Sequence, residues 1–134
     1  MSKNRREFIT TASFVACAPM STLDIEKFGS TEKLLHHVFF WLNAPGSDAD
    51  RRELIRGLQT LKRIRLIKDL IIGIPASTQK RDVIDSSYDV SALMYFDDVE
   101  SQDEYQVHPK HTEFVEQYKH LWNRVVVYDS LIVK

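Results

Sequence analysis

The chain has 134 residues, of which 43% are hydrophobic and 10% aromatic, so it is long enough to build one globular domain with a real core. Eighteen lysines and arginines stand against 19 aspartates and glutamates, and the formal net charge of -1 excludes the basic field that attracts nucleic acid or an anionic membrane. Cys17 is the single cysteine, which excludes an intrachain disulfide, so packing alone must hold the domain together.

The first twenty residues have the pattern of an export signal peptide. A basic start that includes Arg5 and Arg6 precedes a mildly apolar run over residues 8–18. An arginine pair ahead of a bulky apolar pair is similar to a twin-arginine signal, and the run is too short to span a bilayer. The Ala-Cys-Ala sequence at 16–18 offers a cleavage site, with lipidation at Cys17 as an alternative. We expect export to the periplasm or cell envelope, or a cytoplasmic protein if this tail is not a signal.

Residues 1–33 are therefore expected to form a leader and a polar linker, and residues 34–134 the domain. The domain opens with a strand over 34–42, a continuous apolar and aromatic run that stops at Asn-Ala-Pro-Gly. A helix over 48–67 follows, because Ser47 can cap it and leucines then recur at helical spacing.

The remaining elements follow from apolar periodicity and from turn residues. They are a strand over 69–74, a loop over 76–87, a strand over 88–96, a short helix over 98–106, a second helical segment over 109–121 and a strand over 124–133. The order β-α-β-β-α-β predicts an α+β, ferredoxin-like fold with a four-stranded antiparallel sheet and helices on one face.

The other face of this sheet is also apolar. The first strand carries His37, Phe39 and Trp41 on one side and Val38 and Phe40 on the other. An uncovered apolar face of this size is typical of an interface, so we expect a homodimer in which two sheets pair through their open faces. The alternative is a monomer whose N-terminal tail covers the open face.

Histidines and aromatic residues gather at the break between the last two helical segments. After Pro109, helical spacing directs His111 towards the sheet, on one stripe with Phe114 and Tyr118. Such a histidine is most often a satisfied core residue, but its ordinary pKa suits proton transfer near neutral pH.

Three more residues complete the candidate ligand-binding set of His37, Tyr105, His108, His111, Phe114 and Tyr118. Tyr105 can donate a hydrogen bond into the same space as His111, and His37 joins them if it faces the helices. His108 precedes the proline and is expected to serve as a cap or a loop contact. Polar groups that converge in an apolar pocket indicate a ligand site.

The sequence patterns expected for metal, phosphate or acyl-serine chemistry are weak or absent. His108 and His111 are separated by a proline break and have no third ligand, so no metal is expected. The chain has no glycine-rich phosphate loop and no Gly-x-Ser-x-Gly elbow, and we expect no cofactor.

Three strings carry a resemblance to a known family. They are His37-Val38-Phe39-Phe40, Tyr105-x-x-His108-Pro109-x-His111 and Tyr128-Asp129. Together they resemble the stress-responsive dimeric α/β-barrel (Dabb) family over residues 34–134. The resemblance implies a dimer, and many such proteins have no known activity.

One relative within that family, a plant polyketide cyclase, catalyses a cofactor-free aldol condensation. By resemblance, His111 would be the general base, Tyr105 would hydrogen-bond the developing enolate, and His37 would orient the substrate. Three functions are thus open. The first is a stress-response domain that binds a small apolar molecule in a helix–sheet cavity. The second is a cofactor-free cyclase or lyase acting on a β-dicarbonyl compound, and the third, by fold analogy alone, is a monooxygenase.

Overall fold

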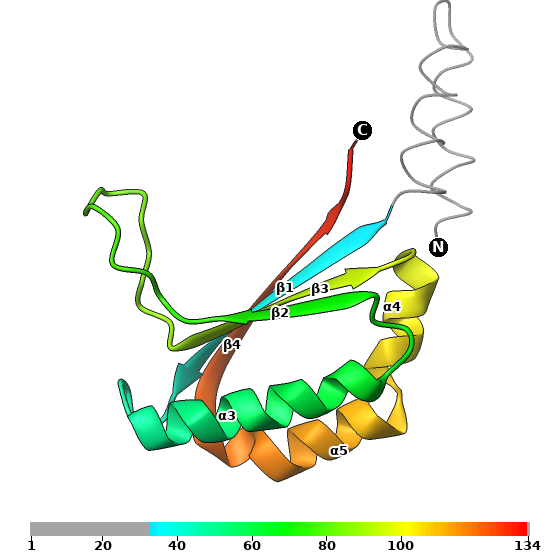
Figure 1. Ribbon diagram of the computed structural model, residues 1–134, viewed down its shortest axis with the longest axis horizontal. Helices are drawn as coiled ribbons and strands as arrows, with labels where there is room; N and C mark the ends of the chain where they lie inside the picture. The colour runs from blue at the N-terminus through cyan, green and yellow to red at the C-terminus, as the bar shows by residue number, and fades with distance from the viewer. Residues whose placement is uncertain (1–32, 134) are drawn as a thin grey trace, which may run out of the picture.

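A computed structural model describes residues 33–133 (Figure 1). The expected leader and all but the last residue of the expected linker lie outside the described residues. The elements in chain order are β1 (Leu34–Leu42), α3 (Asp48–Thr60), the 3-10 turn η1 (Leu61–Arg63), β2 (Asp69–Gly73), β3 (Val90–Phe96), α4 (Val99–Gln106), α5 (Pro109–Tyr118), the 3-10 turn η2 (Lys119–Leu121) and β4 (Trp122–Leu131). Over the described residues, none of these helices has the length and apolarity needed to cross a membrane.

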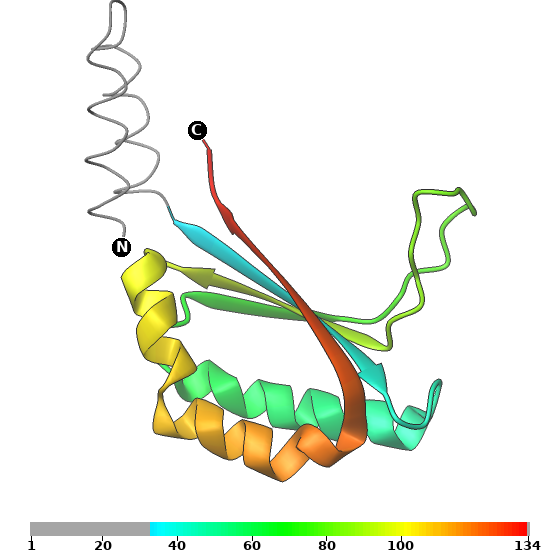
Figure 2. The ribbon, with the colours of Figure 1, turned by 180° about the vertical axis from the view of Figure 1, so that it is seen from behind.

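The four strands form one antiparallel sheet in the order β2-β3-β1-β4. Figures 1 and 2 show α3, α4 and α5 on one face of this sheet, and no described helix on the other. The predicted ferredoxin-like α+β fold is therefore confirmed. The two central strands, β1 and β3, contribute eight of the 17 buried hydrophobic residues of the core.

Strict alternation along β1 separates a helix-facing side from an open side. Every second residue from Leu34 to Leu42 is buried, and the residues between them are half-buried. The helix-facing set includes His36, and its apolar members Val38 and Phe40 share one core with leucines of α3 and with Phe114 of α5. This alternation decides which residues of β1 can reach a site between the sheet and the helices.

The first helix is shorter than predicted. Its α-helical part ends at Thr60 instead of residue 67, and one 3-10 turn follows. The Thr60 hydroxyl donates to the carbonyl of Gly57, and Ile64 then adopts an extended backbone. A tighter last turn satisfies carbonyls that the end of an α-helix leaves free, and the chain can turn towards β2.

The ends of three strands also differ from the predicted ends. β2 ends at Gly73, one residue before the predicted end. β4 runs from Trp122 to Leu131 instead of 124–133. It starts earlier because Trp122 pairs with Leu42 across an irregularity in β1. β3 begins at Val90 instead of residue 88. The residue before it, Asp89, turns inward and has a structural role of its own.

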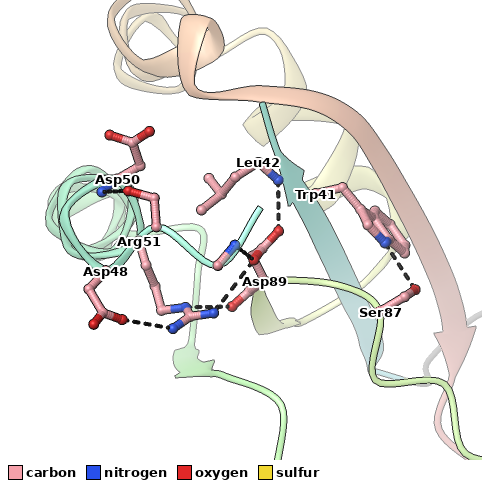
Figure 3. A network of polar contacts seen from close by, with 9 residues as sticks. Trp41, Leu42, Asp48, Asp50, Arg51, Ser87 and Asp89 are labelled. Atoms are coloured by element: carbon pink, nitrogen blue, oxygen red, sulfur yellow. Dashed lines mark hydrogen bonds and ion pairs between the residues drawn. The ribbon is translucent and has the colours of Figure 1, made fainter. Parts of the chain in front are cut away.

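Asp89 ties three segments together (Figure 3). Its buried carboxylate accepts hydrogen bonds from the backbone N–H of Leu42 at 2.9 Å and of Gly46 at 3.0 Å. Arg51 of α3 donates to the carbonyl oxygen of Asp89 at 3.2 Å and pairs with its carboxylate at 3.5 Å. The turn after β1, the start of α3 and the start of β3 are thereby fixed to one another. Gly46 suits this turn because its φ is +77°.

Candidate functional site

A cavity of about 230 Å³ lies between the helix-facing side of β1 and β4 and the two C-terminal helices. Its polar lining consists of His36, Tyr105, Gln106 and His111. Its apolar lining consists of Val38, Phe40, Leu58, Leu61, Met94, Phe114, Val115, Trp122, Val125 and Val127. The cavity is thus an apolar space with one group of polar side chains.

The break between α4 and α5 brings Tyr105 and His111 together. Asp98 caps α4, and His108 caps α5 by accepting a hydrogen bond from the backbone N–H of Lys110 at 3.0 Å. Pro109 occupies the first turn of α5, where its missing N–H is not needed. As a result, the last turn of α4 and the first turn of α5 place the Tyr105 and His111 rings 4.5 Å apart.

Tyr105 is 2% exposed, and its ring lies 5.9 Å from that of His36. Burial raises the pKa of the Tyr105 hydroxyl well above its ordinary value, so the group stays protonated at any physiological pH. Within residues 33–133 no polar atom forms a hydrogen bond with this hydroxyl. Tyr105 therefore offers a buried O–H donor to whatever occupies the cavity.

His111 is half-buried and anchored through one ring nitrogen. Its Nδ1 atom lies 3.1 Å from the carbonyl oxygen of Gln106. A carbonyl can only accept, so Nδ1 carries the proton and, in the neutral ring, Nε2 carries the lone pair. Desolvation by burial lowers the pKa of His111, with smaller contributions from the nearby His36 and His108, and the Gln106 carbonyl partly offsets them. The neutral, Nε2-basic form thus prevails at neutral pH.

His36 stands opposite His111 on β1 and is 5% exposed. Its Nδ1 atom lies 2.6 Å from Oδ1 of Asp129 on β4, its register partner. Because a carboxylate accepts, Nδ1 of His36 donates, and its Nε2 atom remains for a ligand. The cavity therefore holds two histidines that are each held through Nδ1.

Aromatic rings form the other end of the cavity. Trp122 lies 5.0 Å from Phe40 and 5.8 Å from Phe114, measured between ring centroids. Val125 and Val127 of β4 complete this wall. A ligand here would find polar groups at the His36 end and an apolar slot at the Trp122 end.

A model of the family described as the Stress responsive A/B Barrel Domain (Dabb) matches residues 34–132. The chain belongs to the Dabb family. No curated protein is significantly similar to it in sequence.

Solved structures agree with this family and fold. A Dabb family protein with a ferredoxin-like fold from Mesorhizobium loti is 19% identical, with a TM-score of 0.62 over 77% of this chain and 99% of that one. A dimeric ferredoxin-like protein of unknown function from Thermobifida fusca is 17% identical, with a TM-score of 0.61 over 78% and 94%. The hydroxynitrile lyase from Passiflora edulis is 18% identical, with a TM-score of 0.65 over 78% and 96%. At these identities the likeness establishes the fold.

The cavity of this Dabb chain unites three of the six residues expected from the sequence. Tyr105, His111 and Phe114 line it, whereas His108 caps α5 and Tyr118 stacks on Phe114 outside the lining. The expectation that His37 faces the helices is wrong. His37 lies on the open side of β1, where its ring is 4.3 Å from that of Phe39.

Sequence reasoning missed His36, Asp129 and Gln106. His36 takes the place expected for His37, because the buried set of β1 starts at Leu34 and continues through every second residue. The alternation by itself could not distinguish His36 from His37, because β1 is apolar on both sides. Among the described residues, no three His, Cys, Asp or Glu side chains are grouped so that they could hold a metal ion.

Proposed function

We propose that this Dabb protein binds a small, largely apolar molecule with one polar head in the helix–sheet cavity. The polarised lining carries the proposal: His36, Tyr105 and His111 offer polar atoms at one end, and Trp122 lies in an aromatic slot at the other. His36 and Phe40 are four residues apart on β1, which corresponds to roughly 13 Å of strand. The cavity volume of about 230 Å³ is below the usual range for drug-sized ligands, so the ligand is expected to be smaller.

A fluorescence titration tests this proposal. Trp41 lies on the open side of β1, so the Trp41→Phe protein keeps Trp122 as the single tryptophan, inside the cavity. Butyrophenone, an aromatic monoketone, is a suitable probe and should quench Trp122 saturably. Val127→Phe fills the cavity wall and should abolish the quenching, whereas Val83→Phe in the exposed β2–β3 loop should not. Unsaturable quenching that is equal in all three proteins would contradict the proposal.

A second candidate function is that of a cofactor-free lyase or cyclase acting on a β-dicarbonyl compound. The tautomer of His111 favours it, because Nε2 is the basic atom and shares the cavity with the Tyr105 donor. In this reaction Nε2 of His111 takes a proton from the carbon α to a carbonyl, and the Tyr105 O–H stabilises the enolate oxygen. The enolate carbon then attacks a more distant carbonyl carbon of the same polyketide-like chain, and the new alkoxide takes the proton back from His111. That a hydroxynitrile lyase shares this fold is an analogy at the level of the fold.

Hydrogen–deuterium exchange separates the two candidates without a known substrate. In D₂O, NMR would follow the loss of the α-protons of butyrophenone in the presence of the protein. An enzyme with His111 as base should accelerate this exchange, and His111→Ala should reduce it by roughly 10²–10⁴-fold. Binding of butyrophenone that survives His111→Ala, with no acceleration by the native protein, would leave the binding function alone.

The proposed homodimer forms through the open side of the sheet. Its half-buried residues on β1 include Leu35, Phe39 and Trp41, and Tyr128 on β4 is exposed beside them. Dimeric proteins among the structural neighbours support a homodimer, and the apolar residues of the open side support its location. Phe39→Glu should convert the dimer to a monomer in analytical ultracentrifugation, whereas Glu113→Ala on α5 should not.

We also propose that residues 1–20 direct export. The arginine pair followed by an apolar run supports this, and cell fractionation with a mass measurement of the mature N-terminus tests it. A mature chain that starts near residue 19 in the periplasm is the expected result, and an intact chain in the cytoplasm would contradict it.

A further inference from the structure

Two glutamines of α4, Gln102 and Gln106, are hydrogen-bonded to each other at the edge of the cavity, and we call this pair the clamp. Gln102 is a buried polar residue of this helix, and its Nε2 atom donates to Oε1 of Gln106 at 2.7 Å. The two residues are one helical turn apart, a spacing at which side chains meet. Gln106 lines the cavity together with Tyr105 and His111.

Gln106 therefore contributes two different groups to the site, its backbone carbonyl and its side-chain amide. Its backbone carbonyl accepts the hydrogen bond from Nδ1 of His111 and fixes that ring. Its side-chain oxygen accepts the hydrogen bond from Gln102, which leaves the two amide N–H groups of this solvent-exposed residue to donate to a ligand. An amide whose oxygen is held by a buried partner is a pre-organised donor, because less rotational freedom is lost when a ligand binds.

We propose that Gln106 is a specificity-determining residue that donates a hydrogen bond to a second oxygen of the ligand. This inference rests on the proposed binding function and narrows its ligand class. Tyr105 supplies a donor for one carbonyl oxygen, and Gln106 supplies a donor for another on the same side of the cavity. Two donors beside one base suit a β-dicarbonyl compound better than a simple ketone.

A matched pair of probes isolates this second oxygen. Benzoylacetone and butyrophenone share the phenyl ketone and the chain length, and they differ by one carbonyl. Isothermal titration calorimetry on the full protein should show that benzoylacetone binds about three- to tenfold more tightly, as expected for one additional hydrogen bond between neutral groups.

Three kinds of variant then assign the preference to the clamp. Gln106→Met and Gln106→Glu both lack the N–H donors, so in both the ratio of the benzoylacetone affinity to the butyrophenone affinity should fall to about one. Gln102→Leu should weaken the preference, because Gln106 keeps its donor but loses its anchor. Gln117→Leu on an exposed position of α5 is the control and should keep the full preference.

The outcomes separate this inference from the proposed function. The role of Gln106 would be overturned if the native protein bound the two probes with equal affinity, or if the preference persisted in both Gln106 variants. In either case, butyrophenone binding would still support the proposed binding function of the cavity. If neither probe binds the native protein, the proposed function fails and the inference fails with it. A merely structural role of Gln106 would change stability or both affinities together, not their ratio.

Discussion

Nδ1 of His36 lies 2.6 Å from Oδ1 of Asp129, between neighbouring strands at the polar end of the cavity. The side chain of His36 is almost fully buried, whereas that of Asp129 is 46% exposed. Asp129 therefore acts from the solvent side and fixes the tautomer and the orientation of an imidazole that lines the cavity. In this arrangement Asp129 is a positioning residue.

Asp129→Asn should slow α-proton exchange by roughly two- to tenfold, because His36 loses a charged acceptor that is partly screened by water. The measurement is NMR exchange in D₂O combined with the ¹⁵N shifts of the His36 ring, which report its tautomer. Asp97→Asn is the matched control, since Asp97 is also 46% exposed and pairs with Lys33 on the surface. A reduction of equal size in both variants would contradict the positioning role.

Tyr105→Phe should separate activity from stability. Within residues 33–133 the buried hydroxyl has no hydrogen-bond partner, and an unsatisfied buried polar group costs about 1–3 kcal/mol. The variant should therefore unfold at an equal or higher urea concentration. Loss of the enolate donor should slow exchange by roughly 10²–10³-fold. A clear loss of stability in urea denaturation would show that the hydroxyl has a partner and would contradict this account of the site.

The pH dependence of exchange should follow His111. Burial lowers its pKa below the ordinary 6.5, so the basic form is already complete near neutral pH, and the rate should fall only as the pH drops through the lowered pKa. Stability should change in the same direction. The unfolded chain binds a proton that the folded chain resists, so the contribution is fully present above 6.5 and is lost as the pH falls.

A histidine variant at the neighbouring position provides the control for this pH profile. His108→Asn keeps a capping side chain on α5 and removes one histidine outside the cavity lining. Because His108 makes only a minor contribution to the lowering of the His111 pKa, the pH–rate profile should move only slightly towards higher pH. A pH–rate profile that persists in His111→Ala, or that changes equally in His111→Ala and His108→Asn, would show that another group titrates.

Asp89 should stabilise the fold and should have no effect on ligand binding in the cavity. Truncation by Asp89→Ala leaves the N–H groups of Leu42 and Gly46 without their acceptor and Arg51 without its partner. Urea denaturation should show a loss of about 3 kcal/mol, as for other broken buried pairs. Asp85→Ala in the exposed loop should change stability far less. Similar small losses in both would contradict the role shown in Figure 3.

His37 should make the proposed dimer sensitive to acid. Desolvation already lowers its pKa in the single chain, so the neutral form is favoured, and a partner sheet would remove more water. Dimer stability should be complete near neutral pH and fall as the pH drops through the lowered pKa that His37 has in the folded monomer. Sedimentation equilibrium should show this for the native protein, and His37→Leu should keep the dimer at low pH. An identical pH response in both proteins would contradict the placement of His37 in the interface.

The order of elements could be predicted from the sequence because each element carries its own local signal. The leucine spacing of α3, Pro109 at the start of α5 and the apolar strand runs each depend on neighbouring residues. The inward direction of His111 follows from the same helical periodicity. Element ends were harder, because Thr60 and Asp89 form bonds to backbone groups that local patterns do not reveal.

The side of the sheet on which a strand residue lies was the part that the sequence left open. β1 is apolar on both sides, and a shift of one residue exchanges the two sides completely. His36 and His37 are therefore interchangeable until the register with Asp129 and the helix packing are known. Asp129 and Gln106 join the site through long-range pairing and a backbone carbonyl, and neither contact has a local sequence signature.

Native mass spectrometry on protein purified from its own host tests the central claim most directly. The account predicts a dimer that releases a small organic molecule on denaturation, and the same preparation of Val127→Phe should be a dimer without that molecule. Fragmentation of the released molecule would also show whether it carries two carbonyl oxygens. A native dimer without any bound molecule, or one that keeps the molecule in Val127→Phe, would contradict binding in the helix–sheet cavity.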